Sequence, residues 1–455
     1  MNILNNGKWL FIVLLGWSLS FESVVAVYAA DSSPKQVLQE AQKAYEKRDY
    51  QNVLQLLDSL GDTKTDFSQV QRLKMLSFAH LGKTPEGIKE YEKLVKESGR
   101  EDEELLRKFA MTSILPLRSD MRDQMRGAAY TALKEVKSDE VVPYLEEGLA
   151  DGSGMVRALV AEALGNLPAG RSSQKFRQAL QDQAGWVRAA VIKGLGRTGD
   201  QEVVPLIEPL LKDEQPMVQV TAAGALLRLG QRENWARIEQ AAVSHDGYER
   251  GAAMRILGRS ADPRAIPILV NGMSDHQPTI RVASASGLGQ LGLSQAVPYL
   301  VEALTNGIPA LRTAAAVSLG KLGAREAIPL LKKSLHDRDP GVQAAVVDAL
   351  LRLELPYHVV DPTVRGLLAH KNPGLRSGAA KALANGKIRD VMGPLTLLLN
   401  DPVPRPRITA VRSLGRVGGR EILPQLKTAL RDSDQAVQAT AAGAVARILS
   451  TPAKT

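Results

Sequence analysis

The hydrophobic positions of this chain follow a pattern that recurs at a nearly constant spacing. The pattern is clearest at Asp182–Gly199, where an Asp is followed six positions later by Arg or Gln and then by small and aliphatic residues. This Arg or Gln, which we call the marker, occurs eleven times at equal intervals, except that the step from Gln343 to Arg376 is two positions longer. The period is about 31 residues, a length typical of an array of structural repeats. The markers are Arg126, Arg157, Arg188, Gln219, Arg250, Arg281, Arg312, Gln343, Arg376, Arg407 and Gln438.

Each marker begins a helical pattern. Mostly apolar residues stand three, seven and, in most copies, ten positions after it, which places them on one helix face. Many of these helices are expected to end near a glycine, at Gly199, Gly230, Gly292, Gly323 and Gly418. A second helix is expected before each marker, opening around Pro143, Pro205, Pro267, Pro298, Pro329, Pro394 and Pro424. Two antiparallel helices per repeat predict an all-α superhelix in which each unit buries its face on the next.

The repeats resemble HEAT repeats, specifically the short bacterial type that is also found in phycobilisome lyases. This resemblance covers residues 101–450 in about eleven units. It implies a right-handed superhelix of helical hairpins and says little about activity. At about 10 Å per packed helix layer, the units are expected to form a curved rod about 100 Å long.

Residues 31–100 follow a different pattern. The segment Ala44–Asp58 aligns with Ala79–Lys93 at an offset close to the period of a tetratricopeptide repeat, which is about 34 residues. Two degenerate repeats of this kind are therefore expected, with packing positions at Tyr45, Tyr50, Gly82, Tyr91 and Leu94. Because both parts consist of helix pairs, we expect one continuous superhelix, followed by a short tail at residues 451–455.

Residues 1–30 have the pattern of a secretory signal. Lys8 precedes an apolar run at residues 9–19, and small residues lead to a cleavage site after Ala29 or Ala30. Cleavage would make the protein periplasmic or extracellular, without a membrane span. The alternative is an uncleaved membrane anchor at residues 9–27, which is distinguished by whether Met1 remains on the mature protein.

Composition and motifs argue against an enzyme. The chain has no Cys, which excludes disulfides, thiolate metal sites and thioether attachment of a cofactor. Its six His include no HExxH motif and no His-Glu dipeptide, which the lysine-modifying HEAT-type metal hydroxylases carry as iron ligands. Neither GxSxG nor a phosphate-binding loop occurs. We therefore expect no catalytic, metal-binding or cofactor-binding residues.

Asp residues precede eight of the markers by six positions, and Ser244, Asn306 and His370 replace Asp in the others. In HEAT families this Asp/Arg couple forms a hydrogen-bond ladder between adjacent turns, and the Asp can also cap the following helix. The expected structural ladder includes Asp120, Arg126, Asp151, Arg157, Asp182, Arg188, Asp275, Arg281, Asp401 and Arg407. The alternative, in which the Arg column follows nucleic-acid phosphates, is disfavoured, and no nucleic-acid partner is expected.

A second basic column lies nine positions after the marker, and some copies add a cation one helical turn earlier, five positions after the marker. The candidate partner-binding residues are Lys193, Arg197, Arg228, Arg255, Arg259, Arg352, Arg412 and Arg416. The alternative is that these cations only stabilise the negative end of the helix dipole. Two repeats are irregular, at residues 234–248 and 355–358, and are interpreted as local kinks in the superhelix. The alternative is that Trp186, Trp235, Tyr248 and Tyr357 are aromatic interface anchors.

The sequence thus favours an exported, non-enzymatic scaffold that binds acidic or extended protein partners through the concave face of a solenoid. Two alternatives remain open. The lyase resemblance implies an enzyme or enzyme accessory that handles a chromophore, which a visible absorption band would reveal. An uncleaved N-terminus would instead indicate a membrane-anchored envelope assembly factor.

Overall fold

The computed structural model describes residues 33–61 and 66–450, and all regular structure in these ranges is helical. The expected signal at residues 1–30 and the tail at residues 451–455 lie outside the described residues. None of the helices in the described ranges is both long and apolar enough to cross a bilayer. The prediction of an all-α helical solenoid is confirmed.

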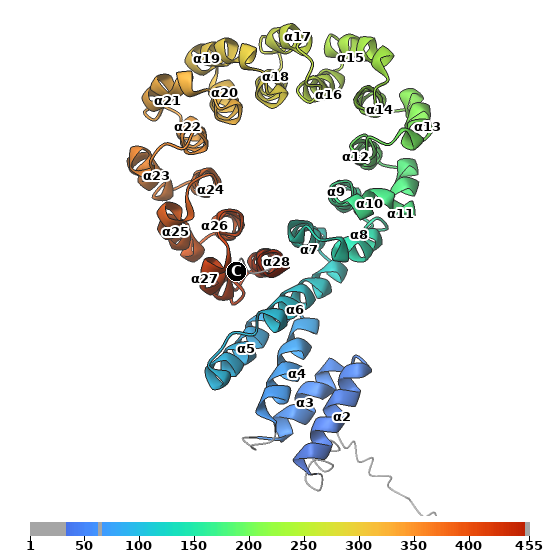
Figure 1. Cartoon of the computed structure of the whole chain (residues 1–455), viewed down its shortest axis with the longest axis vertical. Helices are drawn as coiled ribbons and strands as arrows, with labels where there is room; N and C mark the ends of the chain where they lie inside the picture. The colour runs from blue at the N-terminus through green and yellow to red at the C-terminus, as the bar shows by residue number, and fades with distance from the viewer. Residues whose placement is uncertain (1–32, 62–65, 451–455) are drawn as a thin grey trace, which may run out of the picture.

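The repeats form two concentric layers of helices (Figure 1). The marker helices form the inner layer: α7 (Asp123–Val136), α9 (Gly154–Leu164), α12 (Gly185–Leu195), α14 (Pro216–Arg228), α16 (Gly247–Leu257), α18 (Pro278–Leu291), α20 (Pro309–Leu322), α22 (Pro340–Arg352), α24 (Pro373–Leu383), α26 (Pro404–Val417) and α28 (Gln435–Ser450). The outer layer contains shorter helices: α8 (Val142–Gly148), α10 (Pro168–Ser172), α11 (Gln174–Gln178), α13 (Val204–Ile207), α15 (Trp235–Ala242), α17 (Ala265–Gly272), α19 (Val297–Asn306), α21 (Ile328–Ser334), α23 (Asp361–Leu368), α25 (Ile388–Leu397) and α27 (Leu423–Ala429).

One predicted helix start is wrong. Pro394 lies inside α25, which already begins at Ile388, because Val391 is buried and gives the turn before the proline an apolar side to pack. Gly418 does follow the end of α26, as expected, but with a φ of −102°, so it does not use the left-handed conformation of a typical glycine terminator. The other expected terminators Gly199, Gly230, Gly292 and Gly323 all have positive φ.

The solenoid closes on itself. The last helix, α28, packs against α7 and against α6 (Glu103–Ile114), so the repeats form a ring around an open centre (Figure 1). The expectation of an open curved rod is therefore wrong. The physical reason is the composition of α28, whose buried residues include Val437, Val445 and Ile448 together with a run of alanines. A helix that is apolar on every side requires cover on every side.

Small residues make the seam tight. A Cβ added to Gly443 would lie 2.7 Å from the Ala132 carbonyl oxygen of α7. Ion pairs also join the last repeat to the chain before α7: Arg420 donates to Glu103 at 2.9 Å, and Lys427 and Arg431 pair with Glu101 and Glu92. Exposed pairs contribute about 0.2–1 kcal/mol each, whereas each fully buried aliphatic side chain contributes about 1.5–3 kcal/mol. Apolar burial therefore dominates closure of the ring.

The N-terminal helices form a separate stack beside the seam. Helices α2 (Pro34–Glu46) and α3 (Tyr50–Ser59) make one hairpin, and α4 (Phe67–His80) and α5 (Thr84–Ser98) make a second. Tyr45 of the first hairpin contacts His80 of the second, and Tyr50 stacks on His80 with 4.1 Å between ring centroids. Helix α6 continues this stack into the ring (Figure 1). Two helical hairpins are thus present, and their tetratricopeptide character stays a prediction.

Marker arginines connect successive repeats. Arg157 donates from Nε and Nη2 to both carboxylate oxygens of Asp182 at 2.7 and 2.9 Å, and from Nη1 to the carbonyl of Asp151 at 2.8 Å. The carboxylate belongs to the next repeat and the carbonyl to the same repeat. Rungs of this kind join Arg126–Asp151, Arg157–Asp182, Arg188–Asp213, Arg250–Asp275, Arg312–Asp337, Arg376–Asp401 and Arg407–Asp432.

The ladder is interrupted where the next repeat lacks Asp. Gln219 and Gln343 precede repeats that carry Ser244 and His370, and each donates only to a carbonyl of its own repeat. Arg281 likewise donates to the carbonyls of Asp275 and His276, since Asn306 follows it. At the other end, the Asp120 carboxylate is bound by Arg122 of its own turn. An arginine marker is thus mostly found where the following repeat supplies a carboxylate.

The Asp side chains shape the turns but do not cap the following helices. Asp151, for example, accepts a hydrogen bond from the Ser153 amide at 2.8 Å, two positions on. Ser153 itself is the N-cap residue of α9. The carboxylate therefore forms an Asx turn that orders the chain before the helix, instead of binding the second or third helical amide.

Removal of one ladder carboxylate should weaken the fold. We expect Asp401→Ala to lower the free energy of unfolding by about 3 kcal/mol at pH 7, because Arg376 would remain enclosed without its partner. The Asp401 side chain is only 3% exposed. The hydrogen bond from Arg376 lowers the pKa of Asp401 below its unfolded value of about 3.9. Its stabilisation is therefore complete above about pH 5 and is lost as the pH falls through the folded pKa.

Urea unfolding followed by circular dichroism between pH 3 and pH 7 measures this effect. The control is Asp361→Ala, which removes an i,i+4 pair with the exposed Arg365 and should cost much less than Asp401→Ala. Equal losses in the two variants, or a difference that grows as the pH falls, would show that the rung does not stabilise the fold as described.

A bulky residue at the seam should open the ring. We expect Gly443→Leu to separate α28 from α7, because its side chain would collide with the Ala132 backbone. Small-angle X-ray scattering should then give a larger radius of gyration at unchanged helix content. Gly366→Leu on α23 is the matched control, since a Cβ there meets no atom within 4 Å. A scattering curve identical to that of the wild type would contradict closure through this contact.

Candidate functional site: the basic inner wall

One face of each inner helix is turned toward the central opening. On α12 and the turn that follows it, this face carries Trp186, Ala190, Lys193 and Arg197, at positions two before and two, five and nine after the marker. Their spacing of three to four positions places them along one side of a helix. Because the same positions recur in each repeat, the inner wall consists of parallel columns of side chains.

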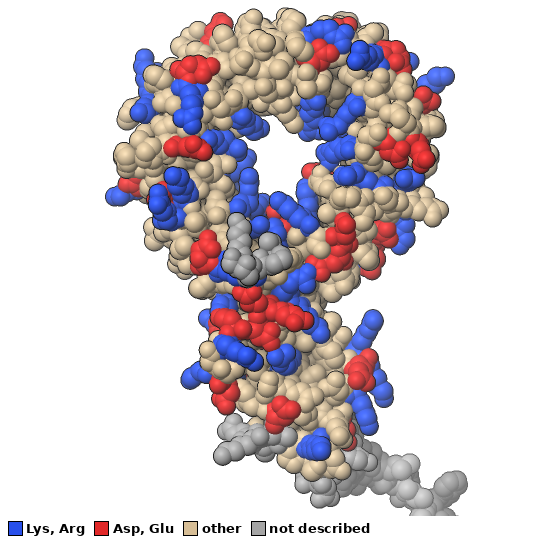
Figure 2. Space-filling view, in the orientation of Figure 1, with Lys and Arg blue, Asp and Glu red and all other residues tan. Residues whose placement is uncertain are grey.

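Basic side chains gather on this wall. In Figure 2, Lys and Arg residues surround the rim of the opening, while Asp and Glu lie mainly on the outside and at the seam. Five of the predicted residues come together on α12, α14 and α16 and form what we call the basic cluster: Lys193, Arg197, Arg228, Arg255 and Arg259. The cluster lines two adjoining cavities with volumes of about 620 and 560 Å³.

The cluster contains little compensating charge. Within the described residues, Lys193, Arg228, Arg255 and Arg259 have no ion-pair or hydrogen-bond partner, and Arg197 donates to the Asn166 side chain at 2.5 Å. Enclosure by the wall and the positive charges of Arg255 and Arg259 lower the pKa of Lys193. Enclosure and the charges of Arg259 and Arg228 also lower the pKa of Arg197. The residues repel one another, so the site favours an anionic ligand.

The remaining predicted residues lie elsewhere on the wall. Arg352 on α22 pairs with Asp348 at 2.8 Å, and Asp348 also accepts from Asn385, so its charge is neutralised locally. Arg412 and Arg416 lie on α26, across the opening from the basic cluster (Figure 1). The Arg412 Nε is buried without a hydrogen-bond partner among the described residues.

The aromatic candidates divide into two groups. Trp235 is 6% exposed, donates to Glu239 at 2.6 Å and stacks under Arg264, so it packs within its repeat. Tyr357 is also partly buried against the core. Trp186 and Tyr248 are instead 56% and 81% exposed. Whether an aromatic side chain is exposed depends on its position relative to the marker. Only Trp186 and Tyr248 stand two positions before a marker, on the inner face, and the sequence alone did not separate them from the two more buried aromatics.

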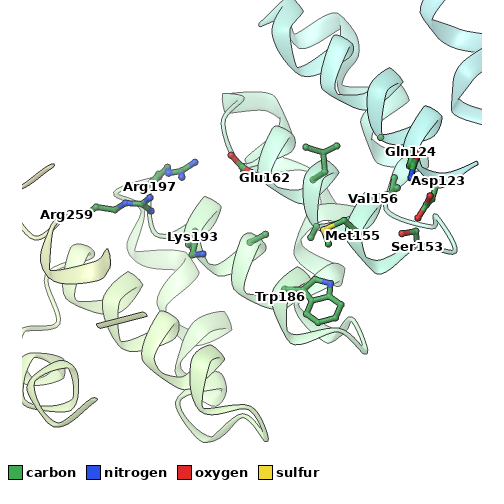
Figure 3. Close-up of a pocket in the computed structure, with 14 residues that line it drawn as sticks. Asp123, Gln124, Ser153, Met155, Val156, Glu162, Trp186, Lys193, Arg197 and Arg259 are labelled. Atoms are coloured by element: carbon green, nitrogen blue, oxygen red, sulfur yellow. The ribbon is translucent and has the colours of Figure 1, made fainter. Parts of the chain in front are cut away.

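Acidic groups border one end of the site. Glu162 on α9 and Asp123 on α7 line the larger cavity together with Lys193, Arg197 and Arg259. Glu162 accepts from Lys134 at 2.9 Å, so this carboxylate is already partly neutralised. Figure 3 shows Lys193, Arg197 and Arg259 at one end of the cavity, Asp123, Gln124 and Ser153 at the other, and Trp186 and Met155 between them. The described residues contain no cluster of His, Asp and Glu that could hold a metal ion.

Comparison with known proteins identifies the repeats. The family model described as HEAT repeats matches residues 112–188, 173–242, 236–316, 278–351, 309–384 and 392–455. The chain belongs to the HEAT-repeat family. A search of the curated proteins found no match.

This HEAT-repeat protein is similar to several solved structures. Human deoxyhypusine hydroxylase is 22% identical over 55% of this chain and 98% of its own, with a TM-score of 0.30. The CpcE–CpcF phycocyanin lyase complex from Nostoc sp. PCC7120 is 22% identical over 53% of this chain and 94% of its own, with a TM-score of 0.36. Kap121p bound to Ste12p is 13% identical over 92% of this chain and 53% of its own, with a TM-score of 0.37.

The electrostatics of the cluster can be measured on Lys193. We expect its amine to react with acetic anhydride at lower pH than a free lysine, because the enclosed site and its cations favour the neutral form. Removal of the neighbouring charges in Arg255→Ala/Arg259→Ala should raise the pKa of Lys193 and slow its labelling at fixed pH. Pulse labelling with peptide mass spectrometry gives both rates. Faster labelling in the double variant would show that these arginines do not repel Lys193.

Proposed function

We propose that this HEAT-repeat ring is a non-enzymatic scaffold that holds a protein partner on its basic inner wall. The observation that carries this proposal is the basic cluster, in which five neighbouring cations line two cavities and none forms an ion pair with a described residue. A helix dipole can account for single cations at helix ends, but it does not require several of them to gather around the same two cavities. An acidic partner would supply the missing charge.

Closure restricts how such a partner enters. A preformed ring admits a chain end, an extended segment or a loop through its opening, whereas a folded domain requires the seam to separate. The basic rim also favours encounter with acidic segments through long-range attraction, which makes association faster at low salt. These properties suit an extended acidic segment of a larger protein.

The remaining parts of the proposal extend the sequence predictions. We propose that the chain is exported through its N-terminal segment, residues 1–30, and acts in the periplasm or outside the cell. The two hairpins of residues 33–98, interpreted as tetratricopeptide-like repeats, would give a second protein-binding surface beside the seam. The ring would then join two partners through one chain.

Charge reversal on the inner wall tests the function. The assay captures proteins from an envelope fraction with the tagged full-length chain. We expect the quadruple variant Arg255→Glu, Arg259→Glu, Arg412→Glu and Arg416→Glu to capture at least about tenfold less of each partner protein than the wild type. The reason is that like charges across an interface oppose binding. Quantitative mass spectrometry of the captured proteins gives the readout.

The matched control reverses four cations on outer helices, Arg237→Glu, Lys332→Glu, Lys333→Glu and Arg389→Glu. It changes the net charge equally and should retain the captured proteins. If every captured protein binds the inner-wall variant as well as the wild type, the scaffold does not use its inner wall and the proposal is wrong. Circular dichroism of both variants shows that the helices remain folded.

A further inference from the structure

Four consecutive inner helices carry a large apolar residue at the position two before the marker. These residues, which we call the apolar row, are Met155, Trp186, Met217 and Tyr248 on α9, α12, α14 and α16. Met155 and Tyr248 are 74% and 81% exposed. The same position elsewhere in the ring holds Gln124, Thr279, Ala310, Gly341, Gly374, Arg405 and Ala436. The row is thus restricted to one section of the inner wall.

The apolar row lies on the same helices as the basic cluster. Trp186 lies in the first turn of α12, whereas Arg197 follows its last residue, Leu195, so the two side chains mark opposite ends of this helix. The larger cavity connects the two ends, since Met155 and Trp186 line it together with Lys193 and Arg197 (Figure 3). The smaller cavity repeats the arrangement with Met217, Arg228 and Arg255. The site therefore presents an apolar edge and a parallel basic edge.

We propose that this section of the wall binds an acidic polypeptide segment in the polyproline II conformation, with an apolar side chain at every third residue. The segment would run across α9, α12, α14 and α16, with its apolar side chains against the apolar row and its carboxylates against the basic cluster. This inference rests on the proposed function, because it identifies the partner's binding segment on the same wall.

Spacing favours this conformation. Packed helices lie about 8–10 Å apart, so successive members of the apolar row are separated by a similar distance. A polyproline II segment has about three residues per turn and rises about 3.1 Å per residue, so every third side chain points the same way at intervals of about 9 Å. A β-strand alternates its side chains and returns to the same face after about 7 Å. The polyproline II period therefore matches the wall better.

Charge distribution favours a peptide over a nucleic acid. A single-stranded nucleic acid could stack its bases on Trp186 and Tyr248. However, it carries a phosphate at every residue and would bring negative charge against Glu162 and Asp123, which line the larger cavity. A peptide with a carboxylate only at every third residue brings fewer negative charges against these acids. The site thus combines cations, acids and apolar side chains in a pattern that a uniform polyanion does not match.

A synthetic peptide tests the proposal directly. The probe is a fluorescein-labelled twelve-residue peptide with the triplet Leu-Pro-Glu repeated four times, titrated with the full chain and followed by fluorescence anisotropy. We expect binding that weakens about tenfold in Trp186→Ala and about tenfold in Arg255→Ala/Arg259→Ala. Trp186→Phe should retain most of the affinity, because an aromatic ring remains. Binding should also shift the emission of Trp186, a signal absent in Trp186→Phe.

Matched controls distinguish binding at this site from non-specific attraction of the peptide to other parts of the protein surface. Tyr299→Ala removes an exposed aromatic from outer helix α19, and Lys332→Ala/Lys333→Ala removes two exposed cations from outer helix α21. Both should leave the affinity within twofold. A peptide of the same composition with its leucines adjacent should bind at least about tenfold more weakly, and so should the Leu-Pro-Lys version.

The outcomes distinguish this inference from the proposed function. Equal binding of the Leu-Pro-Glu and Leu-Pro-Lys peptides, or equal losses in the outer-helix controls, would overturn the inference. The inference would also be overturned if a labelled twelve-residue oligothymidine bound more tightly than the Leu-Pro-Glu peptide and its binding depended on Trp186. If no peptide binds while the captured proteins still depend on Arg255 and Arg259, the scaffold function stands and the polyproline II segment is wrong.

Discussion

The structure depends on one constraint, which is that no repeat can bury its apolar surface alone. Each helical hairpin covers the previous one and exposes a new surface that the next hairpin must cover. An open solenoid ends this series with polar capping repeats. In this protein the two ends cover each other, because α28 packs against α6 and α7 and brings Gly443 against the Ala132 backbone. Closure therefore replaces a cap, much as a closed barrel removes the edges of a sheet.

The marker ladder controls how successive hairpins are oriented. A guanidinium binds both oxygens of a carboxylate in a fixed geometry, so each rung limits rotation between neighbours as well as their separation. The rungs are missing where Ser244, Asn306 or His370 replaces Asp, and two of those three sites follow a Gln marker. An enclosed Arg without a carboxylate would be costly, whereas Gln needs only the carbonyl of its own repeat. The last marker, Gln438, similarly bonds only to the Asp432 carbonyl.

Much of this organisation could be predicted from the sequence, because it repeats. The period indicated the inner helices, and the marker position indicated the ladder residues and the basic columns. Closure could not be predicted from the period, since it depends on the sum of small rotations between repeats. The one local signal was α28 itself, which lacks the polar face expected of a terminal helix. The apolar row was missed because only four copies carry it and the repeat average conceals them.

Closure and the basic cluster also oppose each other. The curvature of the inner wall holds Lys193, Arg197, Arg228, Arg255 and Arg259 near one another, and their mutual repulsion favours a less curved wall. The seam supplies apolar burial on α28, which salt does not screen, whereas repulsion between the exposed cations weakens with ionic strength. An anionic ligand on the wall reduces the same repulsion. Any ligand that binds the closed ring better than the open one must therefore also stabilise closure, by an amount set by its difference in affinity for the two states.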